Sequence, residues 1–199
     1  MTTENAVLMQ RARETLKGKW GLAIGAFLVS MVVSSSLQMI PRIGTIAGIL
    51  VGAPMALGYI LLSLSLVRGQ DTKLEMLFDG FKNFGTALAA YLLTTLFTLL
   101  WSLLLIVPGI IAAISYSMTF FIIADDPVIG PLEAIKKSKA MMDGYKLKYF
   151  LLVLRFIGWG LLCILTLGIG FLWLAPYICI SITHFYEVIK ANPMAPESK

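Results

Sequence analysis

The sequence has little charge and almost none of the residue types that build metal or disulfide sites. Only 14% of its 199 residues are charged, whereas about a quarter are charged in an ordinary soluble domain. It contains one histidine and two cysteines, Cys163 and Cys179, which both fall inside apolar stretches. We therefore expect no disulfide framework, no Cys/His metal site and two buried free cysteines.

Catalytic motifs are missing as well. No spacing matches a nucleophile elbow, a phosphate-binding glycine loop or a metalloprotease helix. The long apolar stretches carry no Asp or Glu, which argues against a proton-coupled pump. Asp125 and Asp126 resemble a carboxylate pair, but solvation of a helix end explains them better, and His184 is expected to be structural. The sequence predicts no enzyme and no cofactor.

Apolar residues are abundant instead. They make up 58% of the chain, and the mean hydropathy is +0.86. Several continuous runs of about twenty apolar residues are long enough to cross a bilayer, and their lack of alternation disfavours a β-barrel. The net charge of +5 fits the positive-inside rule better than nucleic-acid binding. The class predicted is an all-α polytopic membrane protein.

Six transmembrane helices are expected, joined as three hairpins. They cover residues 20–40, 43–67, 84–107, 109–124, 149–166 and 171–186. Breaks between them predict hairpin turns at Pro41, Pro108, Gly109, Gly168 and Gly170. Small residues at four-residue spacing predict a helix-packing seam, which we favour over a pore lining; they are Gly21, Gly25, Gly44, Gly48 and Gly52.

Each hairpin follows a polar segment with one apolar helical face. These segments lie near residues 4–17, 71–83 and 130–148, and such basic amphipathic helices are typical of the membrane interface. A cleaved signal peptide, with residues 22–33 as its apolar core, is the competing interpretation of the first segment and the apolar run after it. In the third, Lys136, Lys137 and Lys139 are expected to contact anionic head groups.

Lys and Arg are distributed very unevenly between the two expected sides. Fourteen of the sixteen lie in the N-terminal leader, the two internal polar segments and the C-terminal tail. Arg42 alone is on the other side, and Arg155 lies within a span. This bias predicts a bacterial cytoplasmic-membrane protein with both termini in the cytoplasm. Residues 188–199, with two prolines, are expected to form a flexible tail.

An internal repeat is suggested by matching motifs. Residues 79–82 read DGFK and residues 143–146 read DGYK, while Gly48, Gly109 and Gly170 recur at intervals of 61. We therefore expect one membrane domain over 1–199, built from pseudo-repeats at about 4–67, 71–124 and 130–187.

Arg155 is the one ionisable residue well inside an expected span. Its insertion is costly, which makes it a candidate for function, although its long side chain can reach back towards the surface. A structural contact with residues 181–184 is the first interpretation. Binding of a lipid phosphate or other anion is the second, and a transport or catalytic role is the third.

The motifs GPLEAIKKS at 130–138, MMDGYK at 141–146, IVPGII at 106–111 and THFYE at 183–187 resemble the hallmarks of DUF975, a bacterial family of integral membrane proteins. The pattern is also similar to the membrane domain of some glycerophosphodiester phosphodiesterases, whose catalytic activity is not expected to carry over. The DUF975 resemblance implies a membrane protein of uncharacterised function and supplies no catalytic residues.

Two classes of function are consistent with the sequence. The first is a non-enzymatic protein that binds membrane lipids or a membrane protein partner in envelope homeostasis. The second is a transporter, or an accessory of export or immunity, for a small molecule or peptide, which predicts a polar cavity near Arg155. No nucleic-acid partner is expected.

Overall fold

The computed structural model describes residues 4–38 and 44–192, which are helical and contain no strand. In chain order the helices are α1 (Asn5–Leu16), α2 (Trp20–Gln38), α3 (Gly44–Val67), the 3-10 helix η1 (Leu74–Asn83), α4 (Phe84–Leu104), α5 (Ile106–Tyr116), α6 (Thr119–Asp125), α7 (Pro131–Met141), α8 (Lys146–Leu165) and α9 (Phe171–Ala191). Six segments of the described chain are long and apolar enough to cross a membrane. The turn predicted at Pro41 lies outside the described residues.

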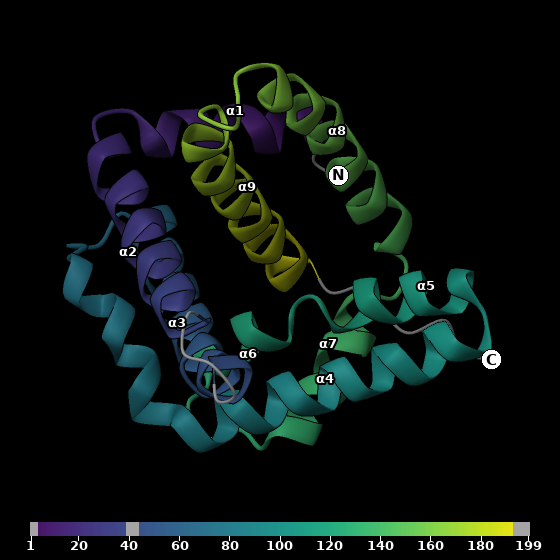
Figure 1. Cartoon of the computed structure of the whole chain (residues 1–199). Helices are drawn as coiled ribbons and strands as arrows, with labels where there is room; N and C mark the ends of the chain where they lie inside the picture. The colour runs from purple at the N-terminus through teal and green to yellow at the C-terminus, as the bar shows by residue number, and fades with distance from the viewer. Residues whose placement is uncertain (1–3, 39–43, 193–199) are drawn as a thin grey trace.

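Consecutive long helices pack in pairs. α2 contacts α3, α4 contacts α5 and α8 contacts α9, and the three pairs follow one another around the molecule (Figure 1). The second helix of each pair is the more buried one. In the segments that contain α3, α5–α6 and α9, 44–56% of the apolar stretch is buried inside the protein. In the segments that contain α2, α4 and α8, 11% is buried. The first partners therefore form an outer layer whose leucines are free to face lipid.

The closest backbone contact joins α3 to η1. A Cβ added to Gly58 would lie 1.9 Å from the carbonyl oxygen of Leu77, and one added to Gly80 would lie 1.9 Å from that of Pro54. Both distances are far below van der Waals contact, so only glycine allows the two helices to approach this closely.

The predicted glycine seam does not coincide with this contact. An added Cβ at Gly21 or Gly52 would meet nothing within 4 Å, and one at Gly25 would meet only the side chain of Leu74, at 3.8 Å. Gly44 is buried and Gly48 half-buried. Four-residue spacing marks a smooth helix face, but it does not say whether a partner backbone lies against it.

The turn between α4 and α5 is at Leu105, whose φ of −162° and ψ of 146° are extended, and not at Pro108 and Gly109 as predicted. Pro108 is tolerated in the first turn of α5 because the N–H it lacks has no intrahelical acceptor there. Gly109 has a packing role instead, since an added Cβ would lie 2.1 Å from Oγ of Ser102 on α4.

The fourth predicted span is divided into α5 and α6 at residues 117–118. Ser138 of α7, which is fully buried, closes this break. Its hydroxyl donates to the carbonyl of Ser115 at 2.8 Å and accepts from the N–H of Met118 at 3.2 Å. The side chain thus satisfies backbone groups that an interrupted helix leaves open.

Two further boundaries concern the last helix pair. α8 passes into α9 through residues 166–170, where Gly168 has a φ of +86° that favours glycine. The predicted tail begins too early, because α9 continues to Ala191. Ile189 is fully buried and Lys190 pairs with Asp125, which holds this end of the helix in place.

Candidate functional site

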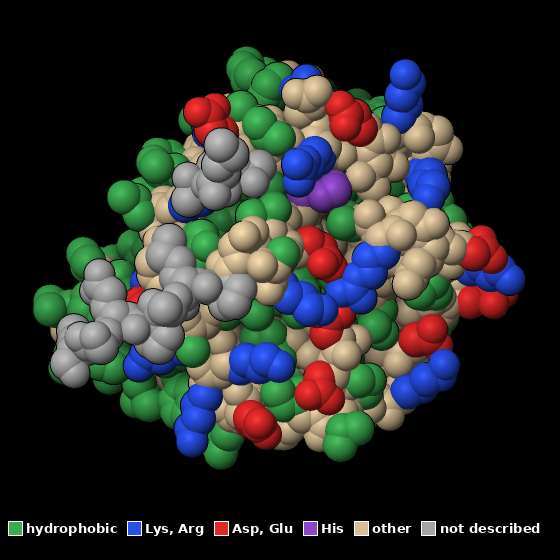
Figure 2. Space-filling model, turned by 180° about the vertical axis from the view of Figure 1, so that it is seen from behind, with side chains coloured by type: hydrophobic (Ala, Val, Ile, Leu, Met, Phe, Trp, Pro, Cys, Tyr) green, Lys and Arg blue, Asp and Glu red, His purple; other side chains and the backbone are tan. Residues whose placement is uncertain are grey.

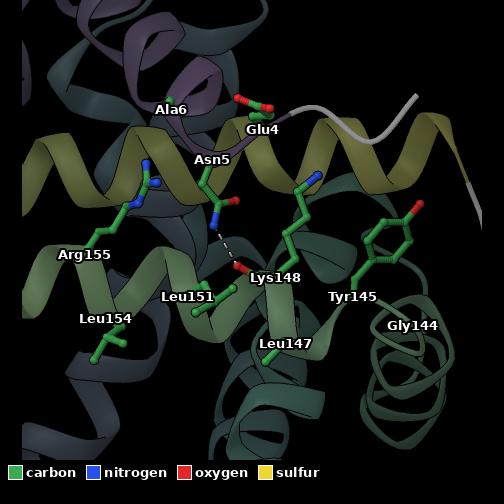
Figure 3. Close-up of a pocket in the computed structure, with 10 residues that line it drawn as sticks. All are labelled: Glu4, Asn5, Ala6, Gly144, Tyr145, Leu147, Lys148, Leu151, Leu154 and Arg155. Carbon is green, nitrogen blue, oxygen red and sulfur yellow. Dashed lines mark hydrogen bonds between the residues drawn. The ribbon is translucent and has the colours of Figure 1, made fainter.

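An open groove of about 800 Å³ lies between the start of α1 and the first half of α8. Its cationic lining residues are Lys148 and Arg155, and its wall includes Leu147, Leu151 and Leu154 (Figure 3). Glu4 is the one acidic residue of its lining. The groove therefore combines two cations and one carboxylate with an apolar wall.

Arg155 is exposed and extends from α8 towards α1 (Figure 3). The predicted contact with residues 181–184 is not found among the described residues, because those groups have other partners. Ser181 and Thr183 donate to carbonyls of their own helix, and Nε2 of His184 lies 2.9 Å from Oγ1 of Thr15. His184 thus joins α9 to α1.

Lys148 and Asn5 meet at the floor of the groove. The side-chain amide of Asn5 donates to the carbonyl oxygen of Lys148 at 3.1 Å, which fixes the start of α1 on α8. Nζ of Lys148 and Oδ1 of Asn5 are buried, and neither has a hydrogen-bond partner among the described residues. A buried ammonium without a partner is unfavourable. A ligand that supplies a hydrogen-bond acceptor to Nζ of Lys148 would therefore be stabilised in the groove.

The three lysines predicted to contact head groups lie on α7 and are exposed: Lys136, Lys137 and Lys139. Ala134, Ile135, Ser138 and Met142 of the same segment are buried, whereas Leu132 is 52% exposed. Lysine, arginine and acidic side chains gather on the face of the molecule seen in Figure 2.

A cluster of charges that the sequence reasoning missed is centred on Asp125, at the end of α6. Nη2 of Arg68, just after α3, lies 2.6 Å from Oδ1 of Asp125 and 2.7 Å from Oε1 of Glu187 on α9. The other Asp125 oxygen accepts from Tyr186 at 2.7 Å and from Lys190 at 2.5 Å. The chain offered one signal: Arg68, Asp125 and Glu187 each directly follow the expected end of an inner span.

The electrostatics of this cluster are balanced. Burial alone would lower the pKa of the Arg68 guanidinium, but its hydrogen bonds to Asp125 and Glu187 outweigh burial and raise that pKa above its ordinary value. Two cations meet two carboxylates, and every one of them has a partner inside the cluster. The described residues contain no group of three or more His, Cys, Asp or Glu that could hold a metal. The cluster therefore acts as a tie between helix ends.

Six candidate spans and an all-helical chain define a multi-pass membrane protein. The sequence matches the family described as "Protein of unknown function (DUF975)" over residues 1–115 and again over 103–193, and the chain belongs to that family. No curated protein and no solved structure matches it.

Proposed function

We propose that the chain is a non-enzymatic protein of the bacterial cytoplasmic membrane that binds the phosphate-bearing head groups of lipids on the cytoplasmic side. In this proposal the helix pairs are three membrane hairpins, repeated within the chain, and α1, η1 and α7 are interfacial helices that introduce them. The proposal includes the expected similarity of the sequence pattern to the membrane domain of glycerophosphodiester phosphodiesterases. Both termini lie in the cytoplasm, and the role is in envelope homeostasis.

The observation that carries the proposal is the two-sided character of α7. Its lysines at 136, 137 and 139 are exposed, while Ala134 and Ser138 are fully buried against the rest of the protein. A helix anchored in this way presents its ammonium groups outward at a fixed height. Each basic residue near an anionic membrane surface contributes about 1 kcal/mol of attraction, so three of them together favour anionic lipids clearly.

The test is lipid enrichment around the extracted protein. A variant with Lys136→Gln, Lys137→Gln and Lys139→Gln is compared with a variant in which the same three residues become Arg, both extracted from membranes with a styrene–maleic acid polymer. The ratio of anionic to zwitterionic lipid is then measured by mass spectrometry. We expect the Gln variant to lose most of its anionic enrichment and the Arg variant to keep it; equal ratios in all three proteins contradict the proposal.

A second candidate function is transport or export assistance for a small molecule or peptide, and the groove beside Arg155 favours it. A transport function requires the groove to be accessible to solutes from the side of the membrane opposite the cytoplasm. With Cys163 and Cys179 replaced by Ala, an impermeant maleimide applied to intact cells would label Leu154→Cys in a transporter. Lack of labelling until the cells are opened supports the lipid-binding function.

A further inference from the structure

We infer that the groove between α1 and α8 is a stoichiometric binding site for one glycerophospholipid, whose phosphate is held by Lys148 and Arg155. This inference deepens the proposed lipid binding by naming a site and a ligand class. It concerns one bound molecule, whereas the α7 lysines act on the surrounding lipid.

The two cations are placed to act together. They are seven positions apart on α8, which is about two turns and about 10 Å along the axis, so both leave the same face of the helix. In Figure 3 both side chains extend towards α1. Arginine binds a phosphate through two parallel hydrogen bonds and lysine binds it as a point charge. Both side chains border the groove in which a phosphodiester would lie, with Asn5 between them (Figure 3).

The two buried polar atoms at the floor of the groove lack one hydrogen-bond acceptor and one hydrogen-bond donor within residues 4–38 and 44–192, and a lipid head group carries both. Nζ of Lys148 lacks an acceptor and Oδ1 of Asn5 lacks a donor among the residues described. Phosphate oxygens satisfy the ammonium, and a head-group hydroxyl or ammonium donates to the amide oxygen. Glu4 leaves the lining with one net positive charge, which suits a monoanionic phosphodiester.

The leucine wall selects a lipid over a free anion. Leu147, Leu151 and Leu154 are 69%, 46% and 48% exposed and follow i, i+4, i+7 spacing, so they form one stripe along α8. The stripe begins beside Lys148, near the expected cytoplasmic end, and continues towards the middle of the helix. An acyl chain attached to a phosphate at the cations would lie along it. Inorganic phosphate has no apolar group that could pack against these leucines.

The test uses the full chain in mild detergent, exchanged until endogenous lipid is removed, and native mass spectrometry. With dioleoylphosphatidylglycerol the wild type should show one retained lipid per chain. The double variant Lys148→Gln, Arg155→Gln should lower that occupancy at least tenfold, and so should Leu151→Gln with Leu154→Gln. Dioleoylglycerol, which has the acyl chains but no phosphate, should give no retained adduct, and excess inorganic phosphate should not displace the lipid.

Matched variants separate this site from the general lipid preference. The α7 triple Gln variant should keep the single retained lipid while losing anionic enrichment. If the α8 double variant keeps the adduct with unchanged helix content and thermal midpoint, the site is wrong, although the proposed function stands. Displacement by inorganic phosphate makes it a free-anion site and also overturns the inference. If replacing the lysines and the arginine with Gln changes neither the anionic lipid enrichment nor the retained lipid, the proposed function itself is contradicted.

Discussion

The guanidinium of Arg68 lies 2.6 Å from the carboxylate of Asp125, which joins the end of α3 to the end of α6. The same guanidinium reaches Glu187 of α9, at 2.7 Å. The three more buried helical segments therefore end at one point and are tied there by charge. Since these segments belong to three different helix pairs, this cluster is a polar contact that links all three.

Replacing Asp125 with Asn should weaken this tie. The change removes the charge that faces Arg68 and Lys190 and leaves two cations with one carboxylate. Asp125 is only 13% exposed while its partners are 33% and 45% exposed, so the cost lies between that of surface and buried pairs. We expect the free energy of unfolding to fall by about 1–3 kcal/mol, measured as thermal unfolding in detergent. Asp126→Asn, at the exposed neighbour, is the control and should change little.

Gly80 should tolerate no side chain. In Gly80→Ala the new methyl group would meet backbone atoms of α3 at 1.9 Å, and backbone cannot rotate away as a side chain can. The helices must separate, and we expect a loss of about 3 kcal/mol or more of stability. Gly85→Ala is the matched control, because nothing lies within 4 Å of its added Cβ and alanine favours the helix. A Gly80→Ala protein as stable as that control would refute the close approach.

The glycines show which features of the fold a sequence pattern predicts and which it does not. Long apolar runs define helices and spans because length and hydropathy are local properties. The importance of a glycine depends on what lies opposite it, and Gly58 and Gly80 meet only after η1 folds back on α3. The stripe at Gly21 and Gly52 had the expected spacing but no backbone against it.

The charged residues around Asp125 likewise find their partners only through tertiary packing. Asp125 could be assigned to a helix end from Pro127, which disfavours helix in the residue before it. Its partners Arg68 and Lys190 are 57 and 65 positions away, and only the packing of three helices brings them together. Arg155 is the opposite case, because packing leaves it exposed. Its place in a groove depends on where α1 lies, which the local sequence does not indicate.

Ser138→Ala should destabilise the break between α5 and α6. The buried hydroxyl serves the carbonyl of Ser115 and the N–H of Met118, and alanine leaves both without that partner. We expect the free energy of unfolding to fall by about 1–3 kcal/mol, with hydrogen exchange at Met118 accelerated. Ser36→Ala is the control, because Ser36 is exposed and, within the described part of the chain, its hydroxyl donates only to the Val32 carbonyl of its own helix. Equal effects at the two sites would contradict the capping role.

Membrane orientation depends on the distribution of charge. Fourteen of sixteen Lys/Arg residues belong to segments expected on one side, with Arg42 alone opposite, and positive segments stay in the cytoplasm. An alkaline phosphatase fused after Lys137 should therefore be inactive, and a green fluorescent protein fused at the C-terminus should fluoresce. A phosphatase fused after Arg42 should be active and serves as the positive control. Phosphatase activity at Lys137 would invert the topology and place the α7 lysines and the groove at the opposite leaflet, where the anionic lipid attraction proposed here would be weakest.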